Sequence, residues 1–310
     1  MSTEQWEDNP LSNKDAVLAP PQSQPVPLTP AGQPDLDNQL TQKEAALKAL
    51  LTDYDSVAVA LSGGVDSTLL LSVAQEVLGT RALALTASMV SLPKREWLAA
   101  EAFCRERDIC HIKVPFDEFA VNGFANNPPN RCYLCKKALL AALIAAAREQ
   151  GTAVLIEGSN LDDENDYRPG NAALAEHGVV SPLKLAGFTK DDIRALSKAR
   201  NLPTWNKPAC ACLATRLPYG TQISPELLER IDAAEQLVLD AGALQARVRV
   251  HDNGNLARIE VDAESVPLFL HTELSRQIDE ALKELGFTYV TLDLLGYQMG
   301  SMNGKHKAAD

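Results

Sequence analysis

Four of the six cysteines form two close pairs, and their spacing predicts chemistry. Cys132 and Cys135 are three residues apart, and Cys210 and Cys212 are two residues apart. In a reducing compartment, close pairs of this kind indicate metal binding more than disulfide formation. A helix that carried the first pair would place its two thiols about one turn apart, so either or both can reach a shared site.

A glycine-rich turn with the sequence Ser-Gly-Gly-Val-Asp-Ser follows an apolar run that is typical of a buried strand. Glycines let backbone N–H groups point outward, and the helix expected to follow adds unpaired N–H groups and its positive dipole end. The hydroxyls of Ser62 and Ser67 can donate to phosphate oxygens, and Asp66 can cap the helix or assist a Mg²⁺ site. The turn predicts a pyrophosphate cradle, formed by Ser62, Gly63, Gly64, Asp66 and Ser67. A glycine pair alone would favour an ordinary strand–helix turn, and the Gly-Lys-Ser/Thr ending of the Walker A loop is absent.

An acidic loop follows a later predicted strand. Its carboxylates are Asp162, Asp163, Glu164 and Asp166. Such crowding is costly unless a cation or a basic ligand offsets it. Because the loop leaves a strand at its carboxyl end, we expect it, with Glu164, to contact Mg²⁺ or the ligand. A solvated acidic loop is the alternative.

Several arginines lie in the second half of the chain. Arg247 and Arg249 are two residues apart on a predicted strand, so they share one face. Two guanidinium groups placed in this way predict a fork for a phosphate, with Glu260 nearby. Arg216, which follows the second cysteine pair, is a further candidate for ligand binding. Arginines on a solvated sheet face are the alternative interpretation.

The elements expected around these residues alternate between strand and helix. Strands are expected at 56–61, 82–87, 110–116 and 152–158, and helices at 39–54, 67–78, 94–107, 134–150 and 189–201, the last with Thr189 as N-cap. This alternation predicts the α/β class, with a parallel sheet covered on both faces. Ligands are then expected at the carboxyl ends of the strands.

The pattern changes after residue 220. Helices are expected at 224–242 and 272–285, and strictly alternating strands at 245–252, 256–262 and 288–294. Strands with one polar face predict an antiparallel or mixed sheet in a smaller α+β domain. We therefore expect three segments: a disordered Pro-rich tail at 1–40, a parallel-sheet domain at 41–220, and a C-terminal domain at 221–310 for substrate binding or oligomerisation.

The bulk composition excludes some classes of function. The net charge of −12 argues against a broad contact surface for nucleic acid, although a local basic pocket stays possible. No apolar run is long enough for a membrane helix, and the acidic N-terminal tail does not resemble a targeting peptide. The expected compartment is the cytoplasm.

The Ser-Gly-Gly-Val-Asp-Ser turn resembles that of the PP-loop ATP pyrophosphatases, whose domain has the adenine nucleotide α hydrolase-like fold. Four further stretches narrow the resemblance: DENDYRPG, WNKPACAC with RLPYG, VRV with ARIE, and YVTLDLLGYQMGSMN. Together they are similar to the LarE family, ATP-dependent sulfur transferases that mature the nickel-pincer cofactor of lactate racemase. The resemblance spans roughly residues 42–304.

This resemblance implies sulfur insertion into pyridinium-3,5-biscarboxylic acid mononucleotide. ATP adenylates a carboxylate, sulfur attacks, and AMP leaves to give a thiocarboxylate; a second round gives the dithio product. Residues 62–67 would hold pyrophosphate, and the acidic loop would help to place Mg²⁺. Arg247 and Arg249 would bind the phosphate of the substrate. The family also implies a homo-oligomer and a small-molecule substrate, with no nucleic acid or membrane partner.

The resemblance also implies the route of the sulfur. Some members give up the sulfur of a single cysteine, and Ala211 occupies that position here. The chain is instead similar to the form in which Cys210, Cys212 and an upstream cysteine bind a [4Fe-4S] cluster, with one iron left open for an extra sulfide. Three ligands are expected, the third being Cys132 or Cys135. Cys210, Cys212 and Asp66 are then the predicted catalytic residues.

Other interpretations remain at this point. The cysteines are also compatible with a structural Cys₄ zinc site. A PP-loop enzyme of tRNA thiolation is a second possible function, which the acidic charge disfavours. A nucleotide-binding regulatory protein without catalysis is a third, which the intact loop and cysteines disfavour.

Overall fold

The computed structural model describes residues 33–152, 154–164, 170–298 and 300–302, without the side chains of 33–37, Glu164 and Asn171. Its contacts divide the chain into Met1–Asn38 and Gln39–Asp310. Most of the predicted tail lies outside the described residues. Helix α1 (Gln33–Thr52) begins within the segment that was predicted to be disordered, so the helix is longer than its apolar pattern indicated.

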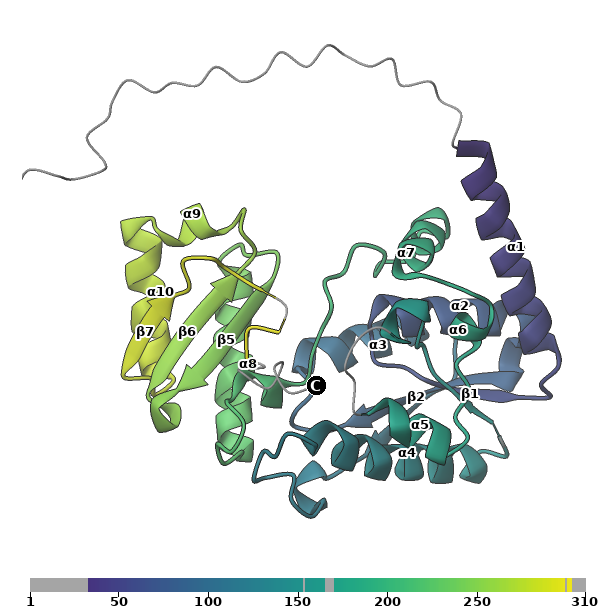
Figure 1. The fold of residues 1–310 in the computed structure, drawn as a ribbon, viewed down its shortest axis with the longest axis horizontal. Helices are drawn as coiled ribbons and strands as arrows, with labels where there is room; N and C mark the ends of the chain where they lie inside the picture. Colours follow the sequence, from purple (N-terminus) through teal and green to yellow (C-terminus); the bar gives the residue numbers. More distant parts are fainter. Residues whose placement is uncertain (1–32, 153, 165–169, 299, 303–310) are drawn as a thin grey trace, which may run out of the picture. The chain divides into compact units, whose positions relative to one another are not determined.

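A four-stranded parallel sheet forms the first core (Figure 1). Its strand order is β3-β2-β1-β4, and its strands are β1 (Val57–Ala60), β2 (Ala82–Ser88), β3 (His111–Pro115) and β4 (Leu155–Ile156). The helices that connect or cover them are α2 (Val65–Leu78), α3 (Lys94–Glu106), α4 (Arg131–Glu149), α5 (Asn171–Glu176), α6 (Pro182–Leu185) and α7 (Lys190–Ala199). The predicted α/β class is confirmed.

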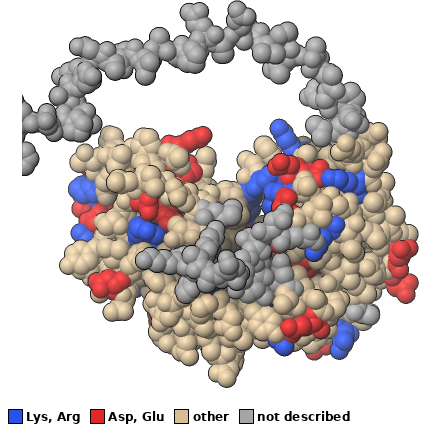
Figure 2. Space-filling model, in the orientation of Figure 1, with Lys and Arg blue, Asp and Glu red and all other residues tan. Residues whose placement is uncertain are grey.

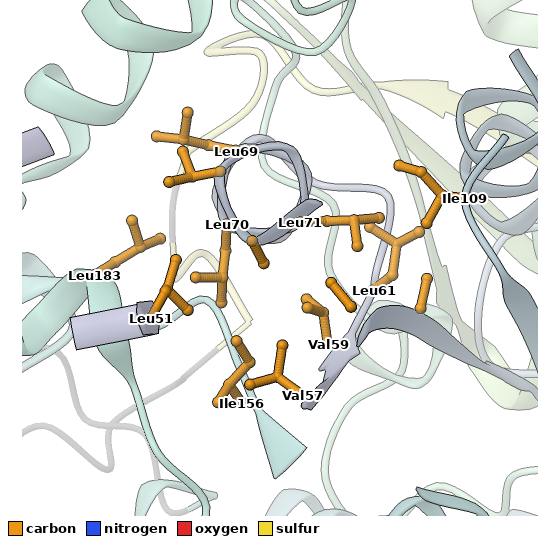
Figure 3. Packing of buried hydrophobic residues seen from close by; sticks show 14 of the residues in the cluster. Leu51, Val57, Val59, Leu61, Leu69, Leu70, Leu71, Ile109, Ile156 and Leu183 are labelled. Atoms are coloured by element: carbon orange, nitrogen blue, oxygen red, sulfur yellow. The ribbon is translucent and has the colours of Figure 1, made fainter. Parts of the chain in front are cut away.

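The alternation of side chains along β1 explains why this sheet is covered on both faces. Val57 and Val59 are fully buried in one apolar cluster, which includes Leu70 of α2 (Figure 3). Ala58 points to the other face and belongs to a second cluster, which includes Leu143 of α4. Burial on both faces matches the nearly continuous apolar run of a central parallel strand.

A three-stranded mixed sheet forms a further core. Its strands are β5 (Ala246–His251), β6 (Leu256–Val261) and β7 (Tyr289–Leu292), and its helices are α8 (Pro225–Asp240), α9 (Val266–Phe269) and α10 (Thr272–Glu284). Strands β5 and β6 are antiparallel, whereas β6 and β7 are parallel. The smaller second sheet was predicted, and its mixed pairing is one of the two expected forms.

The core of the second sheet extends across the expected boundary at residue 220. Phe124, Leu213 and Leu217 are buried in the same apolar cluster as Ile231 of α8 and Val248 of β5. Residues that precede the boundary therefore help to fold the C-terminal sheet. Among the described residues, no helix is long and apolar enough to cross a membrane.

Candidate active site

The glycine-rich turn joins β1 to α2 at the carboxyl end of the parallel sheet. Gly63 has φ +75°, and a Cβ atom there would lie 2.7 Å from the backbone oxygen of Glu96. The turn therefore needs glycine for its conformation and for close approach. Helix α2 begins after Gly64, which has no side chain to cap it, so no side chain covers the first-turn N–H groups. The hydroxyls of Ser62 and Ser67 lie 3.1 Å apart beside this helix end.

Asp66 is bound to a lysine that the sequence analysis did not select. The Nζ atom of Lys190 lies 2.6 Å from both carboxylate oxygens of Asp66, and Nδ2 of Asn160 donates to the same carboxylate at 3.2 Å. Asp66 does not cap α2, so that part of its prediction is wrong. The carboxylate instead faces the segment that follows β4 and the start of α7.

The acidic loop turns back on its own backbone and on α7. One oxygen of Asp162 accepts the N–H of Lys190 at 2.7 Å, and Asp163 accepts the N–H of Asn160 at 3.0 Å. Lys190 thus lies between two carboxylates, those of Asp66 and Asp162. The side chain of Glu164 and the whole of Asp166 lie outside the described residues, so their predicted roles stay predictions.

A second lysine contacts the glycine-rich turn from the segment that carries Cys210 and Cys212. Lys207 donates to the carbonyl oxygen of Gly63 at 2.9 Å, and its Nζ lies 2.8 Å from a carboxylate oxygen of Glu96. The side chain of Glu96 is almost fully buried at the start of α3. One ammonium group therefore connects the turn, α3 and the cysteine segment.

The backbone around Cys212 is held by buried Arg216. Its Nη1 donates to the carbonyl oxygens of Ala211 at 2.8 Å and Cys212 at 3.1 Å, and its Nε donates to Glu235 at 2.6 Å. Both Arg216 and Glu235 have 0% exposed side chains. Arg216 was predicted to bind a ligand; in the structure it holds the cysteine segment.

Glu235 on α8 receives hydrogen bonds from three parts of the chain. Besides Arg216, Nη2 of Arg95 donates to it at 3.0 Å and the N–H of Val248 at 3.1 Å. Burial by itself raises the pKa of this carboxyl, but the charge and hydrogen bonds of Arg216, with Arg247 and Arg95, bring it below its usual value. Glu235 is therefore held as a carboxylate.

A buried contact brings the two cysteine pairs together. Arg131, at the start of α4, donates to the carbonyl oxygen of Ala214 at 3.1 Å and to the side chain of Asn127. Asn127 in turn donates to the carbonyl oxygen of Pro218 at 2.8 Å and accepts the N–H of Gly220 at 2.9 Å. The turn before α4 is thus fixed to the segment that follows Cys212.

The cysteines of the two pairs meet where this contact places them. Cys135 packs in the same apolar cluster as Cys212. Burial raises the pKa of the Cys135 thiol to about 12, and the charges of Cys212, Glu118 and Cys132 add to the rise. The sulfur of Cys132 lies 3.6 Å from Nη2 of Arg131.

The arrangement of donors was compared with the needs of a metal site. In the part of the chain that the structure describes, no group of three His, Cys, Asp or Glu side chains is placed to hold a metal ion. A Cys₄ zinc site, with its ligands about 2.3 Å from one ion, is thus not formed among these residues. A cluster is larger than a single ion, so its thiolates stand further apart, and the thiols of Cys132, Cys135 and Cys212 suit it chemically.

The arginines of the second sheet share one face, as predicted, but this face is buried. In the β5–β6 register, Arg247 pairs with Glu260 and Arg249 with Arg258. Arg247 and Arg249 are only 4% and 5% exposed and Glu260 is 0% exposed, which contradicts the alternative of a solvated face. Nε of Arg249 donates to Glu260 at 2.9 Å, and Arg258 lies 3.0 Å from the same carboxylate.

Two of these arginines also contact the cysteine segment. Arg247 donates to the carbonyl oxygen of Ala209, and Arg249 to that of Thr215 at 3.1 Å. A further donor of Arg249 reaches the hydroxyl of Ser301 at 3.3 Å. On the face of the molecule shown in Figure 2, basic and acidic side chains lie close to one another.

No family model matches the chain. An uncharacterized protein of Synechocystis sp. is 40% identical to it over 264 residues, which cover 85% of this chain and 98% of that protein. Pyridinium-3,5-bisthiocarboxylic acid mononucleotide synthase of Lactiplantibacillus plantarum is 37% identical over 265 residues, which cover 85% of this chain and 95% of the synthase. A glutamine-hydrolyzing GMP synthase of Thermoplasma volcanium is 27% identical over 165 residues, 48% of this chain and 53% of that protein.

The chain belongs to the LarE family. It is accordingly an enzyme, and its parallel-sheet unit has relatives among ATP-utilising PP-loop enzymes such as GMP synthase. The expected family resemblance is confirmed by relatives that extend over most of the chain.

The structure adds four residues to the LarE-type site that sequence reasoning missed. These are Lys190, Lys207, Arg131 and Glu235. Each is a charged residue whose partner lies far away in the sequence; Lys190, for example, is 124 positions from Asp66, and Lys207 is 144 from Gly63. The only sequence signal was position: Lys190 opens a capped helix, and Lys207 precedes the cysteine pair.

Proposed function

We propose that this enzyme inserts sulfur into pyridinium-3,5-biscarboxylic acid mononucleotide at the expense of ATP, forming AMP and pyrophosphate. The single observation that carries the proposal is the contact of Lys207, which connects the glycine-rich turn to the segment that holds Cys210 and Cys212. A phosphate cradle and a thiol-bearing segment are thereby joined, as adenylation followed by sulfur transfer requires. The product named for the Lactiplantibacillus relative supports the choice of substrate.

In the proposed adenylation half, the first-turn N–H groups of α2 and the hydroxyls of Ser62 and Ser67 bind the pyrophosphate of ATP. Lys190, now paired with Asp66, adds a positive charge beside that anion. Asp66, with the acidic loop that includes Glu164, would hold Mg²⁺, which prefers carboxylate oxygens and water. The mutual pairing of Lys190 and Asp66 keeps both charges compensated when neither ligand is present.

In the proposed sulfur half, Cys210, Cys212 and one upstream cysteine hold a [4Fe-4S] cluster. When bound, this cluster supplies an open iron that carries an additional sulfide for transfer. Because Cys135 packs beside Cys212, it is favoured over Cys132 as the third ligand. Arg216, through the carbonyl groups of Ala211 and Cys212, fixes the backbone from which these thiolates project.

The buried arginines supply the proposed contacts to the substrate phosphate. Arg247 and Arg249 present guanidinium groups on one strand face, and a phosphate dianion would compete for donors that now reach backbone carbonyls and Ser301. Glu260 holds Arg249 and Arg258 in place. The cytoplasmic location and the homo-oligomeric state stay predictions.

The test combines metal analysis with turnover. Protein purified anaerobically should contain about four irons per chain and acid-labile sulfide, both lost in Cys210→Ala and Cys212→Ala. With a sulfide source, ATP and the biscarboxylate mononucleotide, it should release AMP and pyrophosphate and form thiocarboxylate, whereas tRNA should not support AMP release. Zinc in place of iron would refute the cluster, and AMP formation with tRNA alone would refute the substrate.

A further inference from the structure

Lys207 occupies a position that the proposed reaction leaves without a task. Its ammonium group is bound on two sides, to the carbonyl oxygen of Gly63 at 2.9 Å and to the carboxylate of Glu96 at 2.8 Å. Gly63 presents its carbonyl oxygen to Lys207, whereas phosphates are bound by N–H groups. The small cavity beside it, about 130 Å³, is lined by Gly63, Thr204 and Lys207 among others and is below the size of nucleotide pockets. Lys207 is therefore placed as a connector and not as a phosphate ligand.

The segment on which Lys207 lies is held along its length. Arg194 of α7 donates to the carbonyl oxygen of Lys207 at 3.0 Å, and Arg247 donates to that of Ala209. Three residues separate Lys207 from Cys210, so their Cα atoms lie within about 11 Å even when the chain is extended. The bond to Gly63 consequently limits how far Cys210 can move from the glycine-rich turn.

Glu96 gives this connection an electrostatic component. Although part of Cys210 is exposed, the surrounding protein and then the charge of Glu96 raise the pKa of its thiol, which shows that the carboxylate lies near the sulfur. Glu96 itself is almost fully buried, and Lys207 compensates its charge. Loss of Lys207 would thus release the segment and leave a buried carboxylate without its partner.

We propose that Lys207 is a positioning residue that couples the two halves of the reaction, by holding the Cys210 segment against the turn where the carboxylate is adenylated. This inference rests on the proposed function. An acyl adenylate has two possible fates: attack by sulfur gives thiocarboxylate and AMP, while attack by water regenerates the carboxylate and releases AMP. In both cases AMP leaves, so the ratio of thiocarboxylate to AMP measures how well the sulfur is placed.

The test is Lys207→Met, assayed for AMP and for thiocarboxylate in the same reaction. We expect AMP formation to stay within about threefold of the unsubstituted enzyme, because the N–H groups that bind phosphate are intact. The ratio of thiocarboxylate to AMP should fall about 10- to 100-fold, the effect expected when a reacting group is displaced by about 1 Å. Iron content should not change, because no cysteine is altered.

Two lysines provide matched controls. Lys190→Met removes the charge beside Asp66, so AMP and thiocarboxylate should fall together and their ratio should stay constant. Lys198→Met removes an ammonium that lies over the Trp205 ring, 4.8 Å from its centroid, and should change neither quantity. Only Lys207 should therefore change the ratio.

Further variants separate positioning from folding. Glu96→Gln with Lys207→Met removes the unpaired buried charge, so it should restore the melting temperature but not the ratio. Lys207→Arg keeps a donor for Gly63 and should recover a large part of the ratio. An unchanged ratio in Lys207→Met, or an equal loss of AMP and product, would overturn the inference. If the unsubstituted enzyme forms no thiocarboxylate at all, the proposed function fails instead.

Discussion

At the scale of single residues, Gly63 is the position where the glycine-rich turn is most sensitive. Alanine there would adopt φ +75° and place its Cβ 2.7 Å from a backbone oxygen of Glu96. Gly79, at the end of α2, also has positive φ, +58°, but nothing lies within 4 Å of its Cβ position. Gly79→Ala thus isolates the conformational strain.

We expect Gly79→Ala to lower the free energy of unfolding by about 1 kcal/mol and Gly63→Ala by about 2–4 kcal/mol, because the second change adds a steric clash. Gly63→Ala should also abolish AMP formation, since the cradle must shift. Urea titrations and the AMP assay measure the two effects. Equal losses of stability in the two variants would show that the clash is absent.

Glu235 is the most heavily bonded buried carboxylate of the site, with Arg216, Arg95 and the N–H of Val248 as donors. Glu235→Gln keeps the shape but leaves Arg216 without its countercharge. Removal of one partner from a buried ion pair costs about 3–5 kcal/mol, so the urea midpoint at pH 7 should fall clearly. Asp240→Asn on the same helix, whose carboxylate accepts from Gln236 at the surface, should have little effect.

The same carboxyl predicts a pH dependence. Its pKa in the folded chain lies below the usual value, whereas an unfolded Glu titrates near about 4.3. The stabilisation is therefore complete above that pH and is lost as the pH falls toward the lower folded pKa. The difference in unfolding free energy between the unsubstituted chain and Glu235→Gln should be constant from pH 7 to about 5.5 and shrink in more acidic solution. A difference that grows with acid would contradict this sign.

At the scale of elements, the N-terminus of α7 connects helix capping to the proposed ATP site. Thr189 forms a capping box with Asp192, and Lys190 is the first residue of the helix. Ser224 caps α8 in a comparable way, through the N–H of Leu227. Thr189→Ala and Ser224→Ala should each cost about 1 kcal/mol of stability.

The two caps should nevertheless differ in function. Fraying at Thr189 displaces Lys190 from Asp66, so Thr189→Ala should weaken ATP binding several-fold, as measured by calorimetry with a non-hydrolysable analogue. Ser224→Ala should leave ATP binding unchanged. If both variants bind ATP equally well, the start of α7 does not position Lys190 for the nucleotide.

Elements with a clear period or a local signal could be predicted from the sequence. The Ala- and Leu-rich helix α4, the capped helix α7 and the alternating strands β5 and β6 all occur where expected. Strand β4 is shorter than predicted, Leu155–Ile156 in place of 152–158, because only these residues pair with β1. Short helices such as α6 have too few turns to show a period.

At the scale of the whole molecule, the parts of the site that could not be predicted are those made by distant pairs. The cradle is a local motif, so residues 62–67 were found from types and spacing alone. The partners Lys190 and Lys207 depend on how β1, α3 and α7 meet, which no local pattern contains. The arginine face was predicted from its period of two, but its burial depends on the cysteine segment and Ser301, which cover it.

The packing across residue 220 predicts that Gln39–Asp310 unfolds as one cooperative unit. Leu213 and Leu217 are buried with α8 and β5, and Arg95 of α3 binds Asp232 and Glu235 of α8. Far-UV circular dichroism and the fluorescence of Trp97 and Trp205 should therefore give the same urea midpoint. A chain that ends at Gly220 would expose this apolar cluster and leave Arg216 without Glu235, so it should show no cooperative transition. Two separate midpoints in the full chain, or cooperative folding of the shortened one, would show instead that the two sheets are independent domains.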